Sequence, residues 1–278
     1  IIPWGDGSDL SFKYAGYNAL FSTPSSTTSY VFKRASALTL SLDFANNFAY
    51  QIYGIGVTSS GASYISEFYS CNCGTQEINR YDSNGNYISA FGTYGTAAGN
   101  LFAPRSITLD SSGNVYVAEN SNSRIQKFNA TGTSQTTWAA NGKLATLNGT
   151  TILVGNGTTV SLYNTSGTSL GSFSTSGTIA ALWADATSIY ASTSSGIEIY
   201  DSFGALQSTV TSITSPGGSA FPLSLNTVGK VVKTSGGEYL FLWGNSIIRA
   251  SGAWQWLSMT YFSSPLDICL LYTSPSPR

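Results

Sequence analysis

Few side chains in this 278-residue sequence could carry chemistry, and histidine is absent. Without histidine the chain can build no Ser-His-Asp or Cys-His nucleophile, no histidine general base and no zinc site of the usual catalytic kind. Carboxylates remain, at positions that read as turns: Asp43, Asp82, Asp110, Asp185 and Asp201. Because turn formation accounts for each of them, we predict no catalytic residues and a protein that is not an enzyme.

Two segments have some of the spacing of metal ligands, and neither predicts a metal site. The run from Asp82 to Asn86 resembles the start of a calcium loop, but its twelfth position is Thr93 where such loops place a bidentate Glu. Cys71 and Cys73 are too close for an easy mutual disulfide. Either one of them pairs with a residue outside this sequence, or both are free thiols. We therefore expect no metal and no cofactor.

Four Asn-x-Ser/Thr sequences could accept N-linked glycans, and their asparagines are Asn129, Asn148, Asn156 and Asn164. A chain rich in Ser and Thr also produces such sequences by chance. Asn129 and Asn164 serve a turn whether or not they carry a glycan. Charged residues make up only 9% of the chain. Low charge and clustered glycan acceptors together predict an extracellular or cell-surface protein.

A repeated pattern positions most of these residues: an aromatic, then Asp or Asn, two variable residues and Gly. Its glycines are Gly85, Gly132, Gly167 and Gly204. Asp or Asn bonds to the backbone of a tight turn, and glycine supplies the positive φ that ends it. A strand-like run precedes each copy, and a large apolar residue follows six positions after each glycine. This short period of strands and turns predicts a β-propeller or a related array.

A second series of hairpins supplies the other half of each repeat. Residues 107–117 read as strand, turn at Asp110 and strand, and residues 40–50 have the same form around Asp43. Two hairpins per period make one four-stranded antiparallel blade. The fold class is therefore all-β, a β-propeller with about five visible blades. The long separation of Asp43 from Gly85 predicts an insertion in the first blade.

Residues 101–132 resemble one NHL repeat, through the segments 101–107, 110–119 and 122–128 and the glycine at 132. The repeat usually has Asp in place of Glu119 and Gly in place of Ser106. The resemblance implies an NHL-type propeller, typically of six blades, so the five visible blades would be an incomplete set. Within the repeat, Glu119 and Arg124 are expected to pair between strands. NHL propellers serve as lyases, RNA binders and adhesion modules, and their lyase sites depend on histidine.

Charge and hydropathy exclude two classes of partner. The net charge is −1 and no run of Lys or Arg occurs, which argues against nucleic acid. No apolar stretch approaches the roughly 18 residues of a membrane span.

We divide the chain into an N-terminal segment, 1–29, that is a partial blade or a linker, the NHL-like propeller, 30–262, and a tail, 263–278. The last ten residues resemble translated sequencing-adapter read-through at the broken end of an environmental reading frame. We therefore expect a non-native tail on an internal, metagenomic fragment, in which the missing signal peptide is uninformative.

Two functions fit these observations. The first is a non-catalytic secreted or cell-surface propeller that binds a protein or a glycan. The second is a carboxylate- and calcium-dependent hydrolase of the lactonase-like propeller type, which needs several Asp, Asn or Glu side chains at the mouth of the channel. Because Arg105 comes just before the expected innermost strand, we predict that it points to the channel mouth and contacts an anionic or carbonyl ligand.

Overall fold

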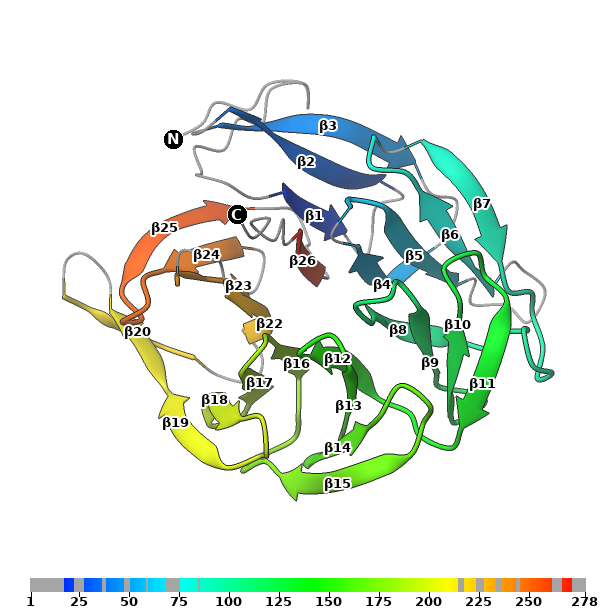
Figure 1. Cartoon of the computed structure of the whole chain (residues 1–278). Helices are drawn as coiled ribbons and strands as arrows, with labels where there is room; N and C mark the ends of the chain where they lie inside the picture. The colour runs from blue at the N-terminus through cyan, green and yellow to red at the C-terminus, as the bar shows by residue number, and fades with distance from the viewer. Residues whose placement is uncertain are drawn as a thin grey trace, which may run out of the picture.

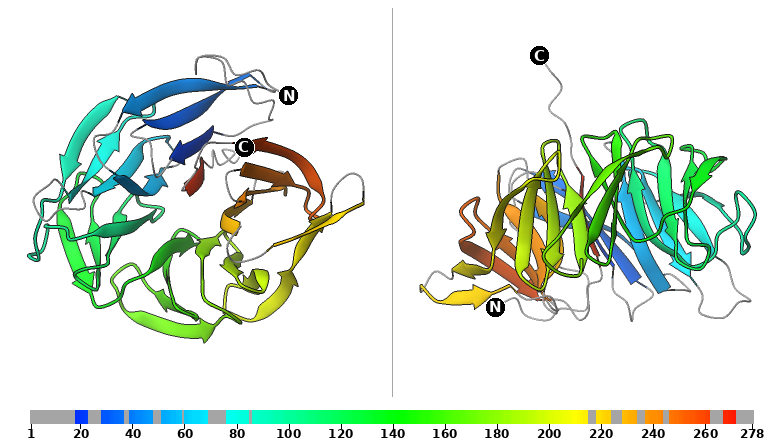
Figure 2. Two further views of the ribbon diagram at one scale, coloured as in Figure 1. Left: turned by 180° about the vertical axis from the view of Figure 1, so that it is seen from behind. Right: turned by 90° about the horizontal axis from the view of Figure 1, so that it is seen from below.

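The chain forms a ring of antiparallel sheets around a central axis (Figure 1). The computed structural model describes residues 18–271 apart from 23–27, 37–38, 48–50, 59, 69–75, 85, 215–217, 224–227, 234–236, 244–245 and 262–266. Figure 2 shows the ring from behind and edge-on, with the strands running between its two faces. The fold is an all-β propeller, as the repeat predicted.

Five blades are each built from four consecutive strands. The first two are β4 (Gln51–Val57), β5 (Ser63–Phe68), β6 (Gln76–Tyr81) and β7 (Tyr87–Phe91), then β8 (Pro104–Leu109), β9 (Val115–Glu119), β10 (Arg124–Phe128) and β11 (Ser134–Trp138). The third comprises β12 (Lys143–Leu147), β13 (Thr151–Asn156), β14 (Thr159–Tyr163) and β15 (Ser169–Ser174). The fourth and fifth comprise β16 (Ala181–Ala184), β17 (Ser188–Thr193), β18 (Gly196–Asp201) and β19 (Leu206–Val210), then β22 (Val228–Lys233), β23 (Tyr239–Trp243), β24 (Ser246–Ala250) and β25 (Trp256–Tyr261).

A sixth four-stranded sheet joins strands that lie far apart in the sequence. It has the order β26 (Asp267–Leu271), β1 (Asn18–Ser22), β2 (Thr28–Ser36) and β3 (Thr39–Asn47). The expected division at 1–29, 30–262 and 263–278 therefore places β1 and β26 outside the propeller segment, whereas both strands pair in this sheet. A two-stranded hairpin, β20 (Ser212–Thr214) with β21 (Ala220–Pro222), lies between the fourth and fifth blades and was not predicted.

The predicted insertion in the first blade is wrong. Asp43 does not open the inner hairpin of the blade that contains Gly85, because it lies within β3, the outermost strand of the sheet that contains β1 and β26. The following blade starts afresh at β4 and has strands of ordinary length. Apolar residues alternate on both sides of Asp43, and this pattern fits either a hairpin or one continuous strand. The chain forms the continuous strand.

Three of the repeated glycines pack against an aromatic ring of the preceding blade. Gly167 has φ +85°, and a methyl group at its Cα would lie 2.6 Å from the ring of Trp138 in the preceding blade. The same relation joins Gly132 to Phe91 and Gly204 to Phe173. The aromatic of each motif completes the contact, since the Trp138 and Tyr163 ring centroids lie 5.7 Å apart. The motif therefore encodes both a turn and a contact between blades.

The antiparallel order gives the ring two different faces. Each inner strand starts on one face and ends at the first turn of its blade on the other. We call the face with the first residues of β8, β12 and β16 the cavity face, and the face with Asp110, Asn129 and Asn164 the turn face. Along the turn face, Asp110 Oδ1 accepts the backbone N–H groups of Ser112 and Asn114, both at 2.9 Å.

Candidate functional site

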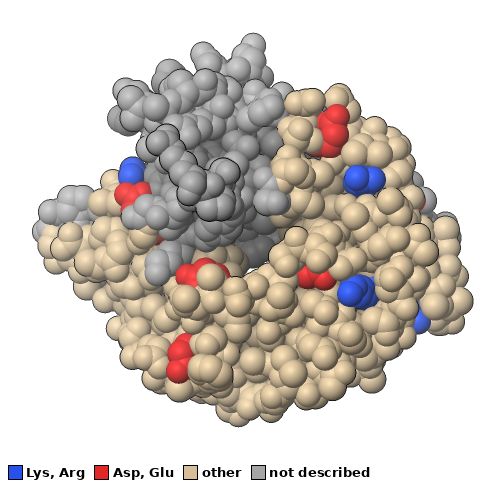
Figure 3. All heavy atoms as spheres, in the orientation of Figure 1, with Lys and Arg blue, Asp and Glu red and all other residues tan. Residues whose placement is uncertain are grey.

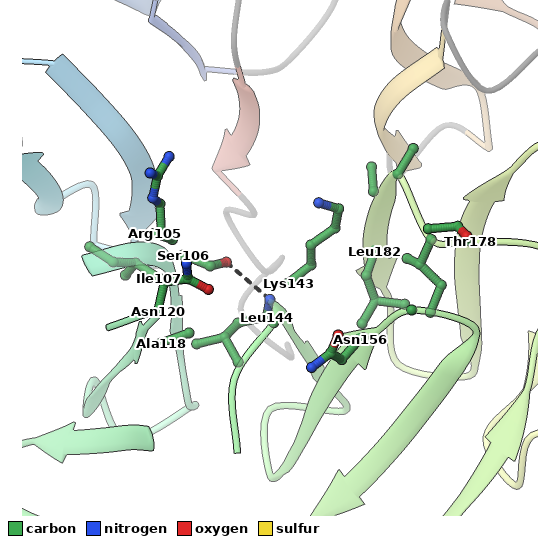
Figure 4. Close-up of a pocket in the computed structure, with 16 residues that line it drawn as sticks. Arg105, Ser106, Ile107, Ala118, Asn120, Lys143, Leu144, Asn156, Thr178 and Leu182 are labelled. Atoms are coloured by element: carbon green, nitrogen blue, oxygen red, sulfur yellow. Dashed lines mark hydrogen bonds between the residues drawn. The ribbon is translucent and has the colours of Figure 1, made fainter. Parts of the chain in front are cut away.

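A cavity of about 580 Å³ opens where three neighbouring inner strands, β8, β12 and β16, begin. Such a volume is typical of sites for small ligands. Its walls come from the starts of these strands, from the link between β13 and β14, and from the segment before β16. The close-up in Figure 4 shows its labelled side chains, with Arg105 and Lys143 extending from adjacent strands to the same side.

Two cations, Arg105 and Lys143, line the cavity, and none of its described lining residues is Asp or Glu. The remaining polar side chains of the described lining are Ser106, Asn120, Asn156 and Thr178. Cations accompanied by hydroxyl and amide groups favour a ligand that carries negative charge and several hydrogen-bonding groups.

Arg105 and Lys143 occupy the same position of two successive repeats. Arg105 lies five residues before Asp110, the residue that follows β8, and Lys143 lies five residues before Asn148, which follows β12. In the next blade the corresponding residue is Ala180, five before Asp185. Neighbouring blades thus present a guanidinium, an ammonium and a methyl group to one cavity.

Two hydrogen bonds tie together the strands that carry these cations. The backbone N–H of Leu144 donates to Ser106 Oγ at 3.0 Å, drawn as a dashed line in Figure 4. Further along the same strands the hydroxyls of Thr108 and Thr146 lie 2.7 Å apart. Because these contacts join residues next to Arg105 and Lys143, they fix the separation of the two strand starts before any ligand arrives.

Gly142, the residue before Lys143, lies close to the backbone of the neighbouring strand. Gly142 has φ +145°, and a Cβ on it would lie 2.3 Å from the carbonyl oxygen of Gly155 in the paired strand β13. That contact with backbone cannot be relieved by a side-chain movement, so any larger residue would displace the start of β12. Gly142 therefore sets the path by which Lys143 enters the cavity.

Lys143 is exposed to solvent yet lies within the mouth of the ring. The surrounding protein partly desolvates the ammonium, and this burial lowers the pKa of Lys143 from its ordinary value. No hydrogen bond or ion pair joins its ammonium to the residues that the structure describes. An anionic group of a ligand would stabilise the charged form of a lysine in this position.

Arg105 lines the cavity. Its contact with a ligand stays a prediction. Arg105 is the second residue of β8, because that strand begins at Pro104 and not after Arg105. Sequence reasoning did not identify Lys143. Figure 3 shows the face toward the viewer, where charged side chains lie singly or in pairs with wide uncharged areas between them.

Glu119 and Arg124, the pair expected within the NHL-like repeat, form an ion pair with Nε of Arg124 at 2.6 Å from Oε1. The Glu119 side chain is fully buried, and its carboxylate also accepts from the backbone N–H of Phe102 at 2.9 Å. Arg124 donates in addition to the carbonyl oxygens of Thr96, Ala97 and Asn100. The pair therefore holds the link between β7 and β8 against the blade.

Glu198 is a second buried carboxylate, held by hydroxyl groups. Thr193 donates to its Oε1 at 2.9 Å, the Ser176 backbone N–H donates to Oε2 at 3.2 Å, and the Ser176 and Tyr200 hydroxyls also donate to it. Burial raises the pKa of Glu198, but the bonds from Ser176, Tyr200 and Thr193 outweigh it and hold that pKa below its usual value. Every contact is to a group of the fold, which makes Glu198 a support for its blade.

Of the other predicted positions, Asp82, Asn129 and Asn164 lie on turns. Asp82 Oδ1 accepts the N–H groups of Asn84 and Asn86, both at 2.8 Å, so the segment that resembled a calcium loop makes a turn. Asn129 and Asn164 accept backbone N–H groups in the same way. Asn129, Asn148 and Asn164 lie on the turn face, whereas Asn156 lines the cavity. Cys71 and Cys73 lie outside the described residues.

The described residues contain no group of three or more Cys, Asp or Glu side chains arranged to hold a metal ion. Within the same part of the chain no helix has the length and apolarity to cross a bilayer.

Comparison with known families agrees with this architecture. Residues 103–128 match the NHL repeat, within the segment that resembled it in sequence. That match covers β8, β9 and β10, including Arg105, Glu119 and Arg124. No curated protein matches the chain.

Several solved structures share the fold of this chain at low sequence identity. A protein of unknown function from Bacteroides caccae has a TM-score of 0.63 at 9% identity, over 92% of this chain and 99% of its own. BamB from Moraxella catarrhalis has a TM-score of 0.54 at 14% identity, over 91% of this chain and 88% of its own. The WD40 repeats of RRP9 have a TM-score of 0.55 at 12% identity, covering 87% of this chain and 68% of theirs. At such identities the likeness concerns the fold alone.

Proposed function

We propose that this chain is a non-catalytic binding module of a secreted or cell-surface protein, which takes a protein or glycan ligand in the cavity between β8, β12 and β16. The observation that carries the proposal is the placement of Arg105 and Lys143 at the same repeat position of adjacent blades, within one cavity. A framework that repeats from blade to blade, with different side chains at the inner strand starts, is suited to holding a binding site.

The chemistry of the lining supports binding over catalysis. General acid–base catalysis at neutral pH uses groups whose pKa values are matched to the task, most often His or a carboxylate pair. The described lining offers one guanidinium, one ammonium, hydroxyls and two side-chain amides. These groups recognise charge and hydrogen-bonding partners.

The alternative is a lactonase-like hydrolase with calcium in the channel. Calcium takes six to eight oxygen ligands, usually with several carboxylates among them. Asn120 and Asn156 are the side-chain amides that the described lining provides, and two cations lie beside them. Positive charge at this point opposes the binding of a divalent cation.

An array experiment tests the proposal. Purified chain is applied to arrays of glycans and of extracellular-matrix and cell-surface proteins, and Lys143→Ala is applied in parallel. We expect a defined set of bound ligands whose signals fall in the variant. In the same preparation, hydrolysis of aliphatic and aromatic lactones is assayed with and without added calcium. Calcium-dependent turnover would overturn the proposal in favour of the hydrolase.

A further inference from the structure

If the cavity is the binding site proposed above, its chemistry also indicates the class of ligand that it binds. We infer that it binds a saccharide unit that bears a carboxylate or a sulfate, with the anionic group between Arg105 and Lys143. The shared feature is an anion on a polyhydroxylated ring.

Charge decides that the ligand is anionic. Lys143 brings its ammonium into a site whose described lining contains no carboxylate. Arg105 adds a planar guanidinium, whose donors match the two oxygens of a carboxylate or sulfate edge. Partial desolvation of this region strengthens each such contact relative to the same contact in bulk water.

Size decides that the ligand is a small unit. A volume of about 580 Å³ is that of a small-molecule site, whereas a stable protein interface buries about 1,600 Å² over a broad surface. Three glycines of the lining, Gly142, Gly155 and Gly157, keep this space open. A single terminal or branching residue of a longer chain fits such a recess.

The walls favour a sugar over a peptide. Asn120, Asn156, Thr178 and Ser106 offer amide and hydroxyl groups of the kind that bond to ring hydroxyls. The apolar part of the described lining is aliphatic, for example Ile179, and contains no aromatic side chain. The described lining therefore lacks the Tyr and Trp anchors that are enriched at the centres of protein–protein interfaces.

The strand starts are held in place before binding. The bond from the Leu144 N–H to Ser106 Oγ leaves the Ser106 hydroxyl hydrogen available to another acceptor. Ser106 is therefore a positioning residue, with its own place in the cavity wall. Removing its hydroxyl should alter affinity for the anionic ligand more than it alters stability.

Calorimetric titration tests the inference with three probes: trigalacturonic acid, its carboxyl-reduced neutral counterpart and a sulfated galactose trisaccharide. Each is titrated into the wild type, Lys143→Ala, Arg105→Ala, Ser106→Ala and the control Arg249→Ala. Arg249 is a cation that pairs with Glu238 and does not line the cavity. A hexaglutamate peptide is the fourth titrant, and circular dichroism verifies that each variant is folded.

We expect at least one anionic trisaccharide to bind and the neutral one to bind at least tenfold more weakly. Lys143→Ala should reduce affinity about tenfold or more, as loss of a charged hydrogen bond would, and Arg249→Ala should leave it unchanged. Whichever of the carboxylated and sulfated probes binds more tightly identifies the anionic group. Added salt should weaken the interaction.

Three outcomes would overturn the inference. Equal affinity for the neutral trisaccharide, or binding of hexaglutamate in place of the sugars with the same dependence on Lys143, would leave the cavity a binding site for another ligand. Anionic sugar binding that Lys143→Ala does not change would move the site elsewhere. If none of the four titrants binds, but the arrays yield ligands whose binding depends on Lys143, the inference of an anionic saccharide is rejected and the proposed binding function is retained.

Discussion

Two regions of the ring differ in how their residues vary from blade to blade. One is the set of glycine–aromatic contacts between neighbouring blades, called the framework here, and the other is the starts of the inner strands. In the framework the same contact recurs: Gly132, Gly167 and Gly204 each lie against an aromatic ring of the preceding blade. At the inner strand starts the corresponding residues are Arg105, Lys143 and Ala180. One region repeats its chemistry around the ring, while the other changes it from blade to blade.

The difference teaches how this fold separates stability from binding. A contact that recurs at three successive pairs of neighbouring blades stabilises the ring as a sum of nearest-neighbour interactions. A position that varies without disturbing these contacts can change its charge at little expense in stability. Substitutions in the framework should therefore lower the melting temperature, and substitutions at the strand starts should change binding.

The largest loss of stability is expected from Arg124→Ala. It leaves Glu119 buried without its cation and releases the carbonyl groups of the link between β7 and β8. Breaking a buried pair from one side destabilises by about 3–5 kcal/mol. Urea unfolding measures this, with Arg249→Ala as the control, because the Arg249–Glu238 pair is partly exposed and worth about 1 kcal/mol or less. Equal effects of the two variants would contradict this assignment.

A similar but somewhat smaller loss is expected from Gly167→Ala. The new methyl group would need a left-handed φ and would collide with the Trp138 ring, and together these cost about 2–4 kcal/mol. Gly237→Ala is the matched control, since Gly237 has φ +80° with nothing within 4 Å of an added Cβ. Only the conformational strain remains there, about 1–2 kcal/mol. If both variants unfold at the same urea concentration, the glycine–ring contact adds no stability.

Glu198→Gln should destabilise the chain by about 1–3 kcal/mol at neutral pH, because an amide nitrogen would face the donors that bind the carboxylate. The pKa of Glu198 is lower in the folded chain than the ordinary value of about 4.3. Its contribution is therefore complete above that ordinary value and is lost as the pH falls through the folded pKa.

Melting temperatures of the wild type and of Glu198→Gln between neutral and acid pH measure this contribution. The difference between the two proteins should narrow as the pH falls, since both then carry a neutral side chain at this position. A difference that stays constant across the range would show that the Glu198 charge does not matter to stability.

Much of the framework could be predicted from the sequence because its signals are local. Asp110 and Asn164 open turns through bonds to residues two and four positions on, so the pattern is visible within a few residues. The Glu119–Arg124 pair also lies within one repeat. The contact of Gly167 with Trp138 crosses between blades, and a pattern along one chain does not show which copy meets which.

The cavity was predicted only in part, for a related reason. Arg105 could be placed because its repeat keeps most of the NHL-like pattern around it. Lys143 lies in a blade that has lost that pattern except at its turns. Counting back five residues from Asn148, as from Asp110 to Arg105, would have identified it. The sheet formed by β26 with β1 joins strands too distant in sequence for any local signal.

The central claim is that the inner strand starts carry binding and the framework carries stability. One measurement tests it directly: the melting temperature and the affinity for the anionic trisaccharide, both determined for the double variant Arg105→Ala/Lys143→Ala. We predict a melting temperature within about 2 °C of the wild type, as for a surface substitution, together with loss of detectable binding. Retained affinity, or a fall in melting temperature as large as that of Gly167→Ala, would contradict the claim.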